Sequence, residues 1–66
     1  LREIQEHKSR HEKTLSKLLE IEQTYLLLPE NKRMTYKLPY LTLRRGILGE
    51  KAWLEWANEA EESIKK

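Results

Sequence analysis

The sequence predicts an all-helical protein, a long antiparallel hairpin of two helices at about residues 2–28 and 35–64. Apolar residues recur at spacings of three and four along both segments, which is the pattern of amphipathic helices. A short proline-containing stretch, residues 29–34, separates them. Phe and Val, which favour strands, are absent from the 66 residues.

The length and composition indicate one small domain, residues 1–66, that depends on association for stability. Chains this short bury little core and need disulfides, metals or partners, and the absence of Cys excludes disulfides. Oligomerisation is the remaining common support. The net charge of +2 is nearly balanced, which argues against a dedicated nucleic-acid-binding module.

The expected location is the cytoplasm. No segment approaches ~18 consecutive apolar residues, the length that spans a membrane, and no basic region precedes an apolar one as in a secretory signal. The chain opens on Leu1 inside a helical pattern, without an initiator Met or an N-cap, so we expect it to be a fragment of a longer protein.

The first helix carries a heptad-spaced series that is more apolar in its second half. A second stripe widens the apolar face towards the C-terminal end of this helix. The first series is Ile4, His7, His11, Thr14, Leu18, Ile21, Tyr25 and Leu28, and the second stripe is Leu15, Leu19, Glu22 and Leu26.

Residues 29–34 are predicted to form the connection between the helices. Pro29 disfavours helix at the residue before it, and Asn31 is a common turn residue. A connection this short makes the two helices antiparallel neighbours. Thr35 is the candidate N-cap of the second helix.

Pro39 leaves two alternatives for the second helix. It lies in the first turn of a helix that starts near Leu38, or it kinks a longer helix. The kinked helix is favoured, because Tyr36 and Tyr40 are four apart and extend the stripe that follows.

Two apolar stripes cover different sides of the second helix, whereas the surface helix of a monomer needs one. The stripes are Tyr36, Tyr40, Leu43, Ile47, Leu54, Ala57 and Ile64, and Leu41, Leu48, Ala52, Trp56 and Ala60. We expect one side to close the hairpin and the other to meet a second copy of the chain, giving a helical homodimer.

No catalytic, cofactor or metal site is expected. His7 and His11 have a spacing that can bind zinc, but too few further ligands lie nearby, so histidines in solvent or between helices are the favoured interpretation. Gly46 and Gly49 match the spacing of a nucleic-acid-clamping GxxG loop, but apolar residues lie between them and no strands flank them. We expect these glycines to allow close packing instead.

A leucine-rich approach leads into an L-x-x-G step and, ten residues after the glycine, a Trp followed by acidic and small residues. The residues are Leu43-Arg44-Arg45-Gly46-Ile47 and Glu55-Trp56-Ala57-Asn58-Glu59-Ala60. This pattern resembles the C-terminal domain of PadR-family transcriptional regulators, of the virulence activator alpha C-terminal type. Pro39 and Gly49 depart from the family's pattern.

The resemblance implies a two-helix module that mediates homodimerisation. In the family it follows an N-terminal winged helix-turn-helix domain, which is absent from residues 1–66, so DNA contact is expected only through that domain. Gly46 and Trp56 carry over as packing positions, and Gly46→Leu is expected to disrupt association more than Gly49→Leu. Some relatives bind a small-molecule effector near the dimer interface, but no residue here indicates one.

The predicted function is therefore that of a dimerisation domain of a PadR-like bacterial regulator, which is not an enzyme and positions two winged helices on an operator. The alternative is a free-standing helical adaptor that binds a partner amphipathic helix. The residues predicted for dimer and core packing are Leu18, Ile21, Tyr25, Leu28, Tyr40, Leu43, Gly46, Ile47, Leu54 and Trp56.

Overall fold

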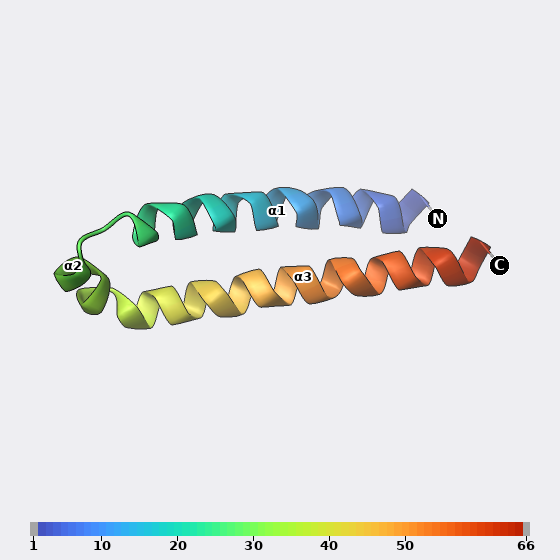
Figure 1. Ribbon diagram of the computed structural model, residues 1–66. Helices are drawn as coiled ribbons and strands as arrows, with labels where there is room; N and C mark the ends of the chain where they lie inside the picture. The colour runs from blue at the N-terminus through green and yellow to red at the C-terminus, as the bar shows by residue number, and fades with distance from the viewer. Residues whose placement is uncertain (1, 66) are drawn as a thin grey trace.

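The computed structural model describes residues 2–65, and three helices account for nearly all of them. The long helices α1 (Arg2–Leu26) and α3 (Lys37–Lys65) lie antiparallel, with the short helix α2 (Glu30–Thr35) between them (Figure 1). The hairpin measures 52 × 14 × 13 Å. The first turn of α1 and the last turn of α3 lie at the end of the hairpin away from α2 (Figure 1). The predicted all-helical class with two long helices is confirmed.

α1 ends at Leu26, two residues before its predicted end. The N–H of Leu27 donates to the carbonyl of Gln23 at 3.1 Å, and the N–H of Leu28 donates to that of Tyr25 at 3.0 Å. The second bond spans three residues, a tightening that is common in a last helical turn. The proline that follows then directs the chain away from the helix.

Residues 29–34 connect the two long helices as predicted, but most of this stretch forms the short helix α2, which the sequence analysis did not predict. The carbonyl of Pro29 accepts bonds from the N–H groups of Lys32 and Arg33, both at 3.0 Å, which closes the first turn of α2. Thr35 is not the N-cap of the next helix. It ends α2, and its hydroxyl donates to the carbonyl of Asn31 at 3.0 Å.

The favoured kink at Pro39 is also wrong, since α3 begins at Lys37 and Pro39 lies in its first turn. The chain leaves helical geometry at Tyr36, where φ is −101° and ψ is 21°. Pro39 has no N–H to offer the carbonyl of Thr35, and its ring crowds that carbonyl. The helix therefore stops at Thr35 and restarts, with the N–H of Tyr40 donating to the carbonyl of Tyr36 at 3.0 Å.

The seam between α1 and α3 follows a heptad spacing on both helices. Among residues 2–65 only Ile47 and Ala57 are fully buried, and the other seam residues are half-buried. α1 contributes Ile4, Lys8, His11, Leu15, Leu18, Glu22 and Tyr25, and α3 contributes Tyr40, Leu43, Ile47, Glu50, Leu54, Ala57 and Glu61.

This seam corrects the series predicted for the first helix. His7, Thr14 and Ile21 are exposed, and their expected places are taken by residues of the second predicted stripe and by Lys8. Of the polar seam residues on α1, the predicted stripes included His11 and Glu22 and left out Lys8. All three lie between the helices because each finds a polar partner on α3.

Candidate association surface

The apolar part of the seam is short. Ile47 and Ala57 are fully shielded from solvent, and Leu54 between them is half-buried. Gly46 lies beside this core and faces α1, because a Cβ atom at Gly46 would stand 3.4 Å from Cδ1 of Leu18. An alanine would make an ordinary contact there, whereas a larger side chain would displace Leu18.

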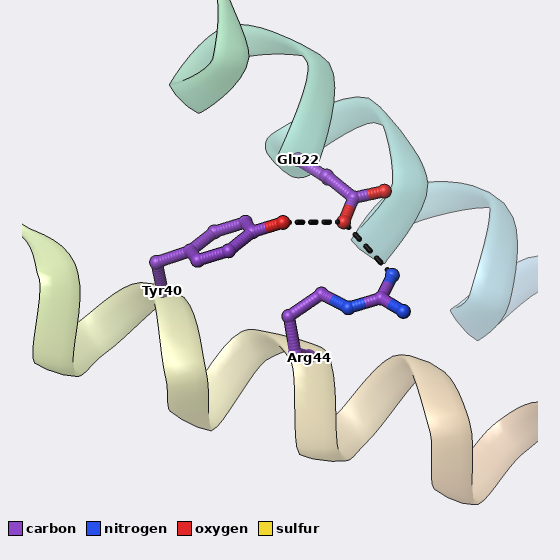
Figure 2. A network of polar contacts seen from close by, with 3 residues as sticks. All are labelled: Glu22, Tyr40 and Arg44. Carbon is purple, nitrogen blue, oxygen red and sulfur yellow. Dashed lines mark hydrogen bonds and ion pairs between the residues drawn. The ribbon is translucent and has the colours of Figure 1, made fainter. Parts of the chain in front are cut away.

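A polar network joins the helices near the connection (Figure 2). The carboxylate of Glu22 on α1 accepts a bond from the Tyr40 hydroxyl at 3.0 Å and another from the Arg44 guanidinium at 2.9 Å, both through Oε2. The Glu22 side chain is 12% exposed, so most of its hydration is replaced by these two donors. The three residues fix the register of α1 against α3 at this point.

Tyr40 keeps its proton within this network. Removal of the phenol from solvent, together with the neighbouring Glu22 carboxylate, raises the pKa of Tyr40 above its ordinary value of 10.0. At neutral pH the phenol is therefore a hydrogen-bond donor to Glu22. The Tyr40 ring also stacks on Tyr25, with ring centroids 4.1 Å apart and planes inclined by 10°.

The Tyr25 hydroxyl ties α2 to the hairpin. It donates to the carbonyl of Arg33 at 2.7 Å, and its ring lies against Tyr40 of α3. One side chain of α1 therefore contacts both later helices, which holds the restart of the chain after Thr35 in place.

A second polar contact lies in the middle of the seam. Nδ1 of His11 pairs with Oε2 of Glu50, and the His11 ring stacks on Trp53 at 3.8 Å with an interplanar angle of 17°. Trp53 in turn lies 5.9 Å from Trp56, at a tilt of 58°. His11 is thus engaged between the helices, and no group of three or more His, Asp or Glu placed to hold a metal occurs within residues 2–65.

The third polar contact joins α1 to α3 near the free end of the hairpin, the end away from α2. Nζ of Lys8 lies 3.2 Å from Oε1 of Glu61, and their side chains are 27% and 13% exposed. With this pair, the seam has a polar link near each end and one in the middle. These links define one register more sharply than the few apolar contacts do.

The side of α3 turned away from α1 is apolar and exposed, and Trp56 at its edge also lines a hollow with Ile4 and His7 of α1. Leu41, Leu48 and Trp56 of the second predicted stripe remain 52%, 54% and 55% exposed, and Ala52 is exposed as well. We call this set, with Gly49, the outer face of α3. A shallow hollow of about 900 Å³ runs along its first half, lined by Leu41, Thr42, Arg44, Arg45, Gly46, Leu48, Gly49 and Glu50.

Gly49 has no explanation inside the hairpin. A glycine in a helix interior costs about 1 kcal/mol relative to alanine. A Cβ atom at Gly49 would meet nothing within 4 Å, whereas the one at Gly46 would reach Leu18. Gly46 therefore faces the seam within the hairpin, and Gly49 is the glycine on the outer face. This placement favours Gly49, and not Gly46 as the sequence predicted, as the glycine whose replacement by Leu directly obstructs association through the outer face.

The predicted packing residues divide between these two regions. Ile47 is buried in the seam, and Trp56 lies on the outer face at 55% exposure. Ile21 is 55% exposed at the edge of α1. The remaining ones are half-buried: Leu18, Tyr25, Leu28, Tyr40, Leu43, Gly46 and Leu54.

The sequence prediction placed His11 and Glu22 in its stripes but missed Lys8, Glu50 and Glu61 as seam residues, and it missed the stacking of Trp53 on His11. A signal for the three charged residues was present, because they follow the heptad spacing of their helices. Charged residues at seam positions become visible only when both helices are compared and the register is known.

None of the helices within residues 2–65 combines the length and the hydrophobicity that a transmembrane span requires. The profile of one protein family, described as the virulence activator alpha C-terminal domain, matches residues 1–65. No curated protein and no solved structure matches the chain significantly.

Proposed function

Since the chain belongs to the virulence activator alpha C-terminal domain family, we propose that it is the dimerisation domain of a PadR-like bacterial transcriptional regulator. The observation that carries this proposal is the outer face of α3, which is as regular as the seam but has no cover within the hairpin. Leu41, Leu48 and Trp56 are each about half exposed there.

The size of the exposed surface supports association. Full burial of a large apolar side chain contributes ~1.5–3 kcal/mol, so covering the exposed half of one contributes about half as much. In a two-fold dimer each such residue is covered on both subunits, so its contribution to the free energy of association is counted twice. The seam itself buries only Ile47 and Ala57 fully, so the added burial is large relative to the core of a single hairpin.

The proposed mechanism is geometric. A rigid dimer fixes the distance between two DNA-binding domains, and that distance must match the spacing of half-sites in an operator. The first turn of α1 and the last turn of α3 lie at one end of the hairpin (Figure 1). A winged helix preceding residue 1 would therefore be held at that end, and DNA contact would come from that domain.

In this proposal the chain acts in the cytoplasm, catalyses no reaction and needs no cofactor. Its side chains act through apolar packing and through polar pairs between helices. The polar seam contacts keep each hairpin straight and in register, and the outer face joins the two copies.

Light scattering of the 66-residue chain at tens of micromolar tests the proposal. We expect twice the monomer mass of 8.0 kDa. Monomer at every accessible concentration would contradict the proposal. It would favour the alternative of a helical adaptor, whose outer face would then receive one amphipathic helix of another protein.

A further inference from the structure

The outer face of α3 bears on the orientation in which a second copy docks, because charge is segregated along this helix. Residues 37–49 contain three basic side chains, Lys37, Arg44 and Arg45, and no acidic one. Residues 50–65 contain five Glu and two Lys, which gives a net charge of −3. The helix therefore changes from +3 to −3 at its middle.

The hairpin neutralises only part of this segregation. Arg44 pairs with Glu22, and Glu50 and Glu61 pair with His11 and Lys8. Arg45 on the basic half and Glu55 on the acidic half are exposed and make no ion pair within the described residues. Both lie within one helical turn of the apolar residues of the outer face.

We infer that two copies pair through the outer faces of α3 in antiparallel orientation, about a two-fold axis that crosses the helix beside Gly49. This inference rests on the proposed function. In that orientation the basic half of each α3 lies along the acidic half of the other, whereas a parallel pair would place like charges together over the whole length.

The position of the axis follows from the apolar residues. Leu48 and Gly49 lie midway between Leu41 and Trp56, so an axis there sets Leu41 beside Trp56 of the partner subunit. The same axis sets Leu48 over Gly49 of the partner subunit, where the open space left by the missing Cβ receives it. The glycine that the hairpin does not explain is thus a point of close approach between copies.

The axis also brings the free charges together. Arg45 comes within one helical turn of Glu55 of the partner subunit, and symmetry makes this pair occur twice. These pairs lie at the rim of an apolar strip, where they set orientation more than affinity. The orientation of the dimer is therefore encoded in the order of charges along one helix.

Cross-linking tests the orientation directly, because the chain has no native Cys. Leu38→Cys and Glu59→Cys change exposed positions at opposite ends of the outer face and leave its apolar centre intact. Under mild oxidation, a mixture of the two variants should give a mixed disulfide dimer, and each variant alone should give little. A parallel pair would give the reverse, since disulfides need Cα atoms within ~7 Å of each other.

Charge reversal tests the rim pair. Arg45→Glu should raise the dimer Kd roughly tenfold, Glu55→Arg should do the same, and the double variant should recover most of the loss. Lys17→Glu and Glu20→Arg are matched controls, because both change exposed charges on α1. Circular dichroism of each variant checks that the helices are intact.

The outcomes separate the inference from the proposed function. Mixed cross-linking and charge rescue in a dimer support both. A dimer that cross-links Leu38→Cys to itself, or that shows no rescue in the double variant, overturns the antiparallel arrangement and leaves the dimerisation domain standing. A monomeric wild-type chain overturns the proposed function, and the inference fails with it.

Discussion

The two sides of α3 differ in how their positions are filled. The inner side mixes a small apolar core around Ile47 with polar links to α1, and each link has a partner in the hairpin. The outer side is apolar along its centre, and its flanking charges at Arg45 and Glu55 have no partner among residues 2–65. The outer side therefore has a regular apolar spacing but no partner within the hairpin, as expected for one half of a symmetric interface.

This difference also shows where register is specified. Within the hairpin, buried or half-buried polar pairs discriminate against a slipped alignment, because a slip would leave Glu22 or Lys8 without its partner. On the outer side, apolar residues would tolerate a slipped alignment better than polar pairs do. The order of charges along α3 and the position of Gly49 must therefore set the alignment of any partner. Substitutions on the two sides should therefore change different quantities.

The largest effect is expected inside the seam. Ile47→Ala removes the one large side chain that is fully buried within the described residues, and should lower the free energy of unfolding by ~2–5 kcal/mol. Urea titration followed by circular dichroism measures it. Leu41→Ala on the outer face is the matched control, and it should change unfolding mainly where dimer is populated. Equal losses for both at all concentrations would remove the distinction between the two sides.

A smaller effect is expected from the network of Figure 2. Glu22→Gln replaces the carboxylate that accepts hydrogen bonds from Tyr40 and Arg44 with a neutral amide. It should lower the free energy of unfolding by ~1–2 kcal/mol, since hydrogen bonds to a charged acceptor are stronger than those to a neutral one. Glu20→Gln, at an exposed position on α1, should change stability little. If both variants unfold at the same urea concentration, the network does not fix the seam.

The raised pKa of Tyr40 predicts a loss of stability in alkali. A group whose pKa is higher in the folded chain than in the unfolded chain stabilises below the unfolded value and stops doing so as pH rises through the folded value. Stability should therefore fall as pH rises above 10.0, the ordinary value for the phenol. Thermal unfolding on both sides of that pH measures the loss. Tyr40→Phe should show a shallower loss than the wild type, and an identical slope would contradict this prediction.

The smallest effect is expected at the free end of the hairpin. Arg2 and Glu6 form an ion pair on α1 at 3.4 Å, with side chains that are 92% and 57% exposed. Exposed pairs of this kind contribute ~0.2–1 kcal/mol, so Arg2→Ala should barely change the unfolding midpoint. Lys8→Ala should cost more, because the Lys8 pair is half-buried and joins two helices. A reversed order would mean that the two helices separate at this end.

Apolar spacing was sufficient to predict the two long helices, their antiparallel packing and the second apolar side of α3. It was not sufficient for α2, because the bonds from Lys32 and Arg33 to the carbonyl of Pro29 depend on where α1 ends. It divided the seam residues of α1 between two stripes and left out Lys8. Glu22 lies in the seam because Tyr40 and Arg44 stand opposite it, and the sequence of one helix does not contain this register.

The role of Pro39 illustrates the same limit. Its ring ends one helix at Thr35 as readily as it opens the next at Lys37, and the sequence pattern of tyrosines around it is compatible with a kink or a restart. The backbone leaves helical geometry at Tyr36, which selects the restart over the kink. The contacts of Tyr25 with Arg33 and Tyr40 then hold that restart in position.

The central claim is that the outer face of α3 joins two copies of the chain. Sedimentation equilibrium of the wild type, Leu48→Glu and Leu27→Glu tests it most directly, because both leucines are exposed and only Leu48 lies on that face. We predict twice the 8.0 kDa monomer mass for the wild type and Leu27→Glu, and the monomer mass for Leu48→Glu at the same concentration. A dimer that persists in Leu48→Glu would contradict the account.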